Sequence, residues 1–286
     1  MTYRHLPEQL RPIAEAARRF FKAERGVSHF KVEEEFDKKV SYRPTLHSIT
    51  RDHYFLCVEV LETPYKAVLD GFVLDCVGHS LPVKLYVAFP GDSEQKTYKD
   101  DVDRARNNGV GALEISKKGD KVIHEAVSLS LFALRPIDKK KFPAKYRSSI
   151  ASAETTFRGG TPEKGCSLVY DEIEDLSRKI AKKTQSKGLW RSLRGGEKPP
   201  RIKLDKGPWE KVMEILIEHL DYKRCPSLKR NLLSRVLGVT AHRNETGHKP
   251  GTVKDLMNRD GELRTRFEGA VDTLMDLITA AKPLRV

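Results

Sequence analysis

The chain has 286 residues and a formal net charge of +13, from 53 Lys and Arg against 40 Asp and Glu. This length suits two domains of about 100 to 200 residues each, and the charge favours polyanionic partners such as nucleic acid. Because no stretch reaches the roughly 20 apolar residues of a membrane span and the four cysteines form no C-x-x-C pair, we expect a cytoplasmic protein without membrane, zinc-ribbon or disulfide structure.

The first half of the chain carries the signals of an α/β domain. Residues 1–26 alternate charged and apolar positions, which predicts an amphipathic helix. Apolar runs rich in β-branched and aromatic residues then alternate with segments of helical spacing, and this alternation predicts a sheet with crossover connections. In chain order these segments are 54–60 (strand), 64–78 (helix), 83–89 (strand), 97–109 (helix) and 110–116 (strand).

The strand signals stop near residue 150, and Gly159, Gly160 and Pro162 follow. We therefore place a domain boundary there, with an α/β domain at 1–150 and a helical domain at 151–286. The helices predicted in the second domain are at about 163–184, 208–222, 227–248 and 262–281. Their apolar positions favour a four-helix bundle and include Val212, Ile215, Leu216, Leu232, Leu233, Val236, Leu274 and Leu277.

The string HRNETGHKPG at 242–251 places an Arg, an amide and a His within six residues at the end of a predicted helix. Arg243, Asn244 and His248 form the pattern R-N-x-x-x-H, which resembles the signature of the HEPN superfamily. The segment GTPEKGCSLVYDEIEDLSRKIAKK also resembles the first helix of HEPN bundles, in which a polar Glu, here Glu174, often faces the motif. The resemblance covers about 130 residues and implies a metal-independent, cofactor-free ribonuclease that acts as a homodimer.

The residue types suit RNA cleavage. RNA supplies its own nucleophile in the 2′-hydroxyl, so strand cleavage needs a group that transfers protons near neutral pH and a cation that stabilises the charged phosphorane. Histidine, with a reference pKa of about 6.5, serves the first task, and the permanently charged, forked guanidinium of arginine serves the second. We therefore expect Arg243 and His248 to be catalytic, with Asn244 beside them and Glu174 in support.

Structural roles for the same residues stay open. Arg243 can instead cap helix carbonyls or pair with Glu174, and His248 can occupy a helix C-terminus, where a cationic ring is favoured. His242 fits a solvated neighbour of the motif. A non-catalytic nucleic-acid-binding or regulatory protein, in which the Arg/His pair grips phosphate, is thus the alternative function.

Cations are concentrated between Arg178 and Lys206, where eleven Lys or Arg stand against Glu197 and Asp205. A phosphate backbone is the natural counterpart of such a field. Trp190 lies inside this segment and either stacks on a base or anchors the connector. The residues expected to contact RNA are Lys182, Lys183, Lys187, Trp190, Arg191, Arg194 and Lys249.

The first domain resembles, more weakly, the PD-(D/E)XK restriction-endonuclease fold in its order of strands and helices. That family holds Mg²⁺ with an acidic residue after a motif proline and with an E-x-K on the next strand. Here Thr45 follows Pro44, and Glu59 is followed by Val60 and Leu61, so the acid after the proline and the lysine are both missing. Asp52, Asp70 and Asp75 are candidate substitutes, although solvated or capping carboxylates describe them better.

The resulting expectation is an α+β two-domain chain: a restriction-endonuclease-like α/β domain, inactive as a nuclease, followed by an all-α HEPN four-helix bundle. We expect an endoribonuclease of the toxin or antiviral-defence kind that cuts RNA without a metal or cofactor. The first domain then binds a trigger ligand or a regulatory protein. A metal-dependent DNA nuclease in the first domain is a third, weaker possibility.

Overall fold

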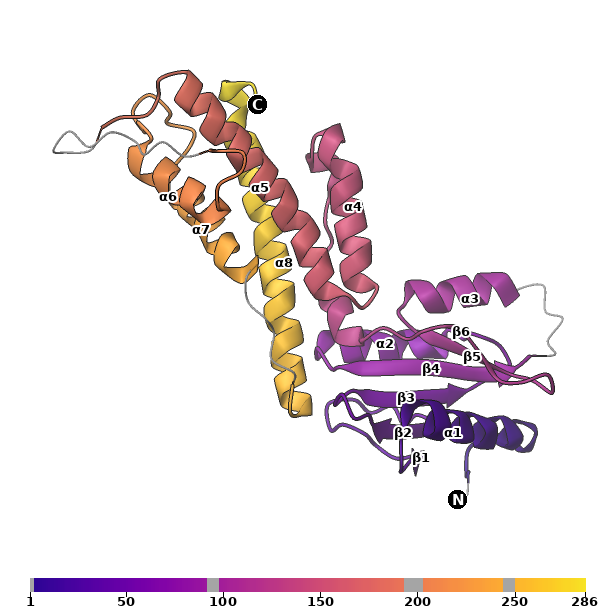
Figure 1. Ribbon diagram of the computed structural model, residues 1–286. Coiled ribbons are helices and arrows are strands. Elements are labelled where there is room, and N and C mark those ends of the chain that lie inside the picture. Colours follow the sequence, from indigo (N-terminus) through magenta and orange to yellow (C-terminus); the bar gives the residue numbers. More distant parts are fainter. Residues whose placement is uncertain (1–2, 92–97, 193–202, 244–249) are drawn as a thin grey trace. The chain divides into compact units, whose positions relative to one another are not determined.

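The computed structural model describes residues 3–91, 98–192, 203–243 and 250–286 of the chain (Figure 1). The chain divides into two compact units. Unit 1 comprises residues 1–134, 158–160 and 249–264, and unit 2 comprises residues 135–157, 161–248 and 265–286. Residue 150, the expected domain boundary, lies inside a helix, and unit 1 takes in a segment from far along the sequence.

Unit 1 is built on a mixed sheet whose strand order, within the described residues, is β1-β2-β3-β4-β5-β6. Strands β3, β4 and β5 run parallel, and the outer pairs β1/β2, β2/β3 and β5/β6 are antiparallel. Helices α2 and α3 supply the crossovers that parallel pairs require. The strands are β1 (Lys31–Val32), β2 (Leu46–Ile49), β3 (Phe55–Val60), β4 (Val83–Pro90), β5 (Gly111–Ile115) and β6 (Lys121–His124).

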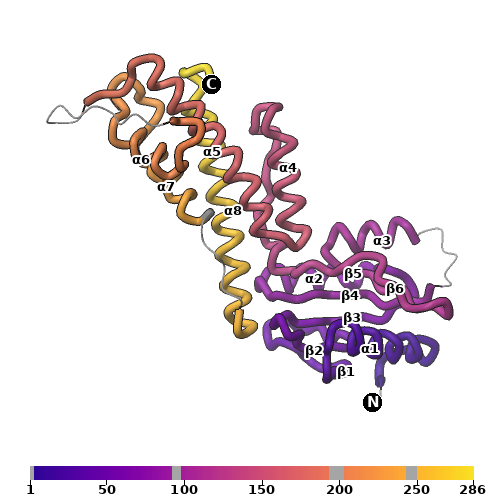
Figure 2. Tube along the Cα trace, viewed as in Figure 1, coloured from indigo at the N-terminus to yellow at the C-terminus, as the bar shows by residue number. Residues whose placement is uncertain are grey.

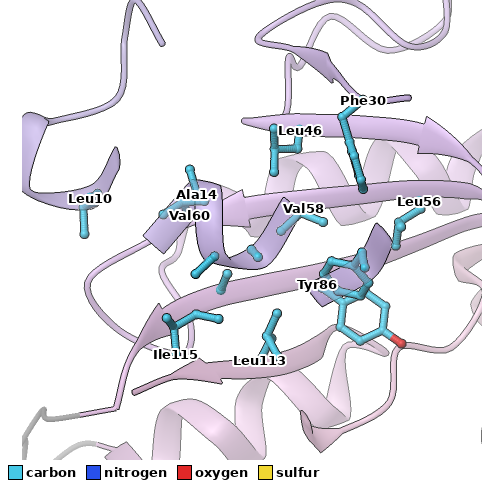
Figure 3. Close-up of a cluster of buried hydrophobic side chains, with 14 of the residues drawn as sticks. Leu10, Ala14, Phe30, Leu46, Leu56, Val58, Val60, Tyr86, Leu113 and Ile115 are labelled. Carbon is cyan, nitrogen blue, oxygen red and sulfur yellow. The ribbon is translucent and has the colours of Figure 1, made fainter. Parts of the chain in front are cut away.

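The sheet buries apolar side chains on both faces, because successive residues of a strand point to opposite sides. Tyr86 and Ala88 of β4 belong to the core cluster on the α1 side, which Figure 3 shows. Val87 and Phe89 of the same strand belong to the cluster that packs with α2 and α3. The helices of unit 1 are η1 (Glu8–Leu10), α1 (Arg11–Arg25), α2 (Val68–Gly78), α3 (Tyr98–Asn107) and η2 (Leu129–Ala133).

Unit 2 is helical in its described residues, and α6 and α7 lie side by side in contact with α5 (Figure 2). Phe157 of α4 packs against Phe267 of α8 with ring centroids 4.7 Å apart. Helix α8 belongs to unit 1 up to residue 264 and to unit 2 from residue 265. The helices are η3 (Lys139–Lys141), α4 (Ala144–Arg158), α5 (Pro162–Ser186), α6 (Trp209–His219), α7 (Arg230–Arg243), α8 (Val253–Ala281) and η4 (Lys282–Leu284).

The predicted strands at 54–60, 83–89 and 110–116 are confirmed as β3, β4 and β5. The predicted helices are confirmed with shifted ends, the largest shifts being the start of α1 at Arg11, predicted at residue 1, and the start of α8 at Val253, predicted at residue 262. All eight apolar positions named for the helical domain are buried, and each fully buried side chain of this size contributes about 1.5 to 3 kcal/mol. A chain that combines an open mixed sheet with many helices is thereby confirmed, whereas the HEPN arrangement of the helices stays a prediction.

A helix that crosses a bilayer needs about 20 predominantly apolar residues. None of the helices within the described ranges is both long and apolar enough to cross a bilayer.

Candidate nucleic-acid interface

Helix α7 ends at Arg243, the first residue of the expected catalytic motif. The next motif residues, Asn244 and His248, and the neighbouring Lys249 lie outside the described residues, as does Arg194. The backbone of Arg243 is therefore at the C-terminal end of a helix of unit 2, as the sequence predicts. How the Arg and His side chains meet stays a prediction.

Glu174, the expected supporting residue, is bound to Arg178 one turn further along α5. Its Oε1 accepts hydrogen bonds from Nε of Arg178 at 2.8 Å and from Nη2 at 2.6 Å. Both side chains are mostly buried, with 19 and 15 % of their surfaces exposed. A bidentate pair in this setting is stronger than a surface ion pair because water screens it less.

Arg178 also forms hydrogen bonds with the backbone of the segment that leads into α6. Its Nη1 donates to the carbonyl oxygen of Leu204 and its Nη2 to that of Gly207, each at 2.8 Å. Nearby, the indole Nε1 of Trp209 donates to Oγ of Ser177 at 2.9 Å. Arg178 was counted among the cations available to RNA, but its guanidinium is engaged within the protein. Its partners are backbone carbonyls some 26 residues away in sequence, which no local pattern reveals.

The lysines of α5 lie at the surface. Lys182 is exposed and faces Asp205 at 3.7 Å, and Lys179 pairs with Asp175, whose hydrogen bond raises the pKa of the lysine above its usual value. Lys183 is half-buried, and Lys187 is exposed just after the helix end. These ion pairs are solvent-exposed, and exposed pairs contribute about 0 to 1 kcal/mol, so the ammonium groups can exchange their partner for a phosphate.

Trp190 and Arg191 are held in place by the end of α5 and the end of α6. The indole Nε1 of Trp190 donates to Oγ1 of Thr184 at 2.9 Å, and its backbone bridges to Leu220. The amide of Arg191 donates to the carbonyl of His219 at 2.8 Å, while the side chain of Arg191 is exposed. The geometry of Trp190 is that of an anchor, one of the two roles that the sequence leaves open.

In unit 1, Glu59 lies on β3 beside a cavity of about 390 Å³, whose lining includes His5, Glu33 and Arg43. The backbone amide of Thr45 donates to its Oε2 at 3.0 Å. Burial raises the pKa of Glu59 to about 7, and the hydrogen bonds that it accepts counter this effect in part. The neutral acid is therefore well populated near physiological pH.

Asp52, Asp70 and Asp75, the candidate substitutes for the missing metal ligands, do not gather in a metal site. Asp70 accepts hydrogen bonds from the hydroxyl of Tyr65 at 2.7 Å and from Arg104 at 2.5 Å, so it is a structural carboxylate. Asp52 and Asp75 are exposed. Within the described residues no group of three or more His, Cys, Asp or Glu side chains gathers closely enough to hold a metal ion.

Two ionisable groups of unit 1 have shifted pKa values that the sequence did not predict. Burial lowers the pKa of Lys84, whose Nζ lies 4.1 Å from the ring centroid of Tyr54. Burial raises the pKa of Asp260, which accepts hydrogen bonds from the hydroxyls of Ser128 and Ser130. Lys84 could have been noticed because it lies inside the apolar run VKLYVAF. Asp260 could not, because its surroundings depend on contacts distant in sequence.

No family model, curated protein or solved structure matches the chain.

Proposed function

We propose that the chain is a metal-independent endoribonuclease of the HEPN type, with Arg243 and His248 as the catalytic pair of unit 2. The observation that carries the proposal is the string R-N-x-x-x-H beginning at the last residue of α7, in a helical unit whose α5 carries exposed lysines. Gly247 and Pro250 predict that the helix ends near His248, which would let its imidazole turn toward the long side chain of Arg243.

In the proposed reaction, the 2′-oxygen of the RNA attacks the adjacent phosphorus, and the bond from phosphorus to the 5′-oxygen breaks. The 2′-hydroxyl gives up its proton and the 5′-oxygen receives one, so that a 2′,3′-cyclic phosphate and a 5′-hydroxyl end result. His248 carries out proton transfer, and Arg243 stabilises the charge on the phosphorane with its forked N–H donors. Homodimerisation, as the HEPN resemblance implies, brings two such pairs to one cleft.

The remaining parts of the proposal concern unit 1 and the cell compartment. Unit 1 has the strand alternation seen in nuclease-like sheets, but Glu59 lies there without the partners of a metal centre among the described residues. We infer that unit 1 binds a trigger ligand or a regulatory protein, as in toxin and antiviral-defence effectors. The four cysteines are buried and form no disulfide within the described residues, which suits a reducing cytoplasm.

The first prediction is that His248→Ala and Arg243→Ala each lower the rate of RNA cleavage at least about 100-fold, because general acid–base and charge-stabilising groups contribute at this level. Arg243→Lys is expected to be poor as well, since an ammonium cannot replace the fork. Cleavage of mixed RNA by the purified chain, in the presence of EDTA, is followed on gels, and the ends are analysed for the cyclic phosphate.

His242→Ala is the matched control, because it removes an imidazole next to the motif and is expected to keep full activity. Wild-type turnover in the His248→Ala variant, or a strict requirement for Mg²⁺, contradicts the assignment and directs attention to unit 1.

A non-catalytic nucleic-acid-binding protein is the second candidate, favoured by the exposed lysines of α5 independently of the motif. It predicts RNA binding without any cleavage by the wild type.

A further inference from the structure

A shallow groove of about 520 Å³ lies on the surface of unit 2. Three separate segments form it: the start of α4, the C-terminal half of α5 and the residues after η4. We call it the basic groove, and its lining consists of Lys145, Lys179, Lys182, Lys183, Ser186, Arg285 and Val286. Among these described residues, five side chains are cationic and no lining side chain is a carboxylate.

The four lining residues of α5 form one stripe. Lys179, Lys182, Lys183 and Ser186 are related by steps of three and four residues, and such positions share one face of a helix. Like charges at this spacing repel one another and destabilise the helix that carries them. Lys145 and Arg285 add charge of the same sign from segments distant in sequence.

The carboxylates of the protein neutralise the groove incompletely. Lys179 and Lys182 have the exposed partners Asp175 and Asp205. Lys183 and Arg285 form no ion pair with a carboxylate of the described residues. The groove therefore concentrates positive charge on an open surface, which raises the local concentration of an anion.

We propose that the basic groove binds the phosphate backbone of a single RNA strand and guides the strand across unit 2. This proposal deepens the proposed function, on which the choice of RNA as the strand rests. It extends the expected contacts of Lys182 and Lys183 to Lys145, Lys179 and Arg285.

The dimensions favour a strand over a small anion. Seven residues separate Lys179 from Ser186, which corresponds to about 10 Å along the axis of α5. A stacked strand advances about 3.4 Å per nucleotide, so this length accommodates about three phosphates. The groove is also open, whereas sites for small molecules enclose most of the surface of their ligand.

The lining further predicts how the strand is recognised. The lining side chains include no aromatic ring on which a base could stack, since the nearby Tyr146 is buried and has Lys145 over its ring, with Nζ 4.9 Å from the centroid. Contacts with phosphate position a strand but carry no sequence information. Binding is therefore expected to be independent of sequence and strongly dependent on salt.

The second prediction tests the groove by binding alone. The probe is a fluorescent 12-nucleotide strand of 2′-O-methyl RNA, which lacks the free 2′-hydroxyl needed for cleavage, and its anisotropy with the full chain is measured at several salt concentrations. The variant combines Lys145→Gln, Lys183→Gln and Arg285→Gln, which removes three charges and keeps most of each side chain. Its affinity is expected to fall about 10- to 100-fold, and the slope of log K against log salt is expected to fall by about 2.

The matched control combines Lys211→Gln, Lys223→Gln and Arg230→Gln, three exposed cations of unit 2 outside the groove. It changes the net charge equally and is expected to change the affinity less than threefold. Far-UV circular dichroism checks that both variants are folded. Equal losses in the two variants, or unchanged binding in the groove variant, overturn the proposal.

Two further measurements separate the related hypotheses. If inorganic triphosphate displaces the probe at a concentration near that of the protein, the groove is a site for a small polyphosphate. This result overturns the proposal that it binds an RNA strand. Strands of different sequence are expected to bind equally. If the wild type does not cleave unmodified RNA but the groove variant loses binding as predicted, the ribonuclease proposal fails and the groove stands.

Discussion

The two units of the chain differ in the surroundings of their ionisable side chains. In unit 1, burial raises the pKa of Glu59 and of Asp260 and lowers the pKa of Lys84, so it favours the neutral form of all three. Unit 2 exposes cations along α5, and the less exposed Glu174 and Arg178 are paired with each other. We therefore expect pH to govern the stability of unit 1, whereas ionic strength and polyanions act on unit 2.

The largest expected effect on stability concerns the close approach of α4 and α5 in unit 2. A Cβ atom added at Gly165 would lie 2.7 Å from Cβ of Phe157 and 2.9 Å from the carbonyl oxygen of Ala153. Because one of these neighbours is backbone, the helices would have to move apart. The third prediction is that Gly165→Ala lowers the free energy of unfolding of unit 2 by about 2 to 3 kcal/mol.

Urea unfolding followed by tryptophan fluorescence measures this change, since Trp190 and Trp209 both belong to unit 2. Gly238→Ala is the matched control, because Gly238 is an exposed position of α7 where an added Cβ meets nothing within 4 Å. It is expected to stabilise the unit by about 0.5 to 1 kcal/mol. Equal midpoints for the two variants would show that α4 and α5 are not tightly packed.

The fourth prediction addresses the buried carboxyl of unit 1. An acid whose folded pKa lies above its unfolded value binds more protons in the folded state, so stability falls as pH rises between the two values. For Glu59 this window runs from the ordinary 4.5 to about 7. Glu59→Gln is expected to stabilise unit 1 at pH 8 by about 1 to 3 kcal/mol and to have little effect at pH 4.5.

Amide hydrogen exchange of peptides from β3 and β4, corrected for the intrinsic pH dependence, measures the stability of unit 1 locally. Burial lowers the pKa of His47, which acts in the opposite direction, so the comparison of variant with wild type isolates Glu59. Glu62→Gln is the control, because it removes an equal charge from an exposed residue that pairs with Lys66. The same pH dependence in all three proteins contradicts a titrating Glu59.

The sequence predicted the sheet of unit 1 better than the extent of either unit. Strands β3, β4 and β5 are buried runs of β-branched and aromatic residues, so a local pattern reveals them. Helix α4 was missed because three of its buried positions, Ala153, Ile150 and Tyr146, are mixed with serines and charges in AKYRSSIASAETTFR. A weak apolar stripe of this kind becomes a helix through packing, here against α5 and Phe267.

The division of the chain into two units could not be predicted from local sequence patterns either. The first turns of α8 belong to unit 1, where Leu256 and Asp260 are buried. The hydroxyls of Ser128 and Ser130, about 130 residues away, satisfy the carboxyl of Asp260. Helical periodicity predicts that such a helix has a buried face but not which remote residues cover it. The boundary expected at 150 therefore followed only the end of the strand signals and the glycines and proline after it.

For the candidate interface, the residues stay predictions, and one of the cations counted with them, Arg178, is engaged within the protein. The spacing of Glu174 and Arg178 is that of a helical ion pair and was open to prediction. Their burial was not, because it depends on the carbonyls of Leu204 and Gly207. The convergence of Lys145 and Arg285 on the stripe of α5 likewise arises from tertiary structure.

The smallest expected effect separates anchoring from base stacking at Trp190. Trp190→Phe removes the hydrogen bond from the indole to Thr184 but keeps an aromatic ring, so the fifth prediction is a loss of about 1 kcal/mol in the stability of unit 2. Affinity for the 2′-O-methyl RNA probe should stay within twofold. Trp209→Phe is the matched control, because it removes an equivalent bond to Ser177 from a buried indole. A loss of RNA affinity in the first variant alone, with stability unchanged, would mean that the indole of Trp190 contacts a base, and unit 2 would then read its ligand through more than charge.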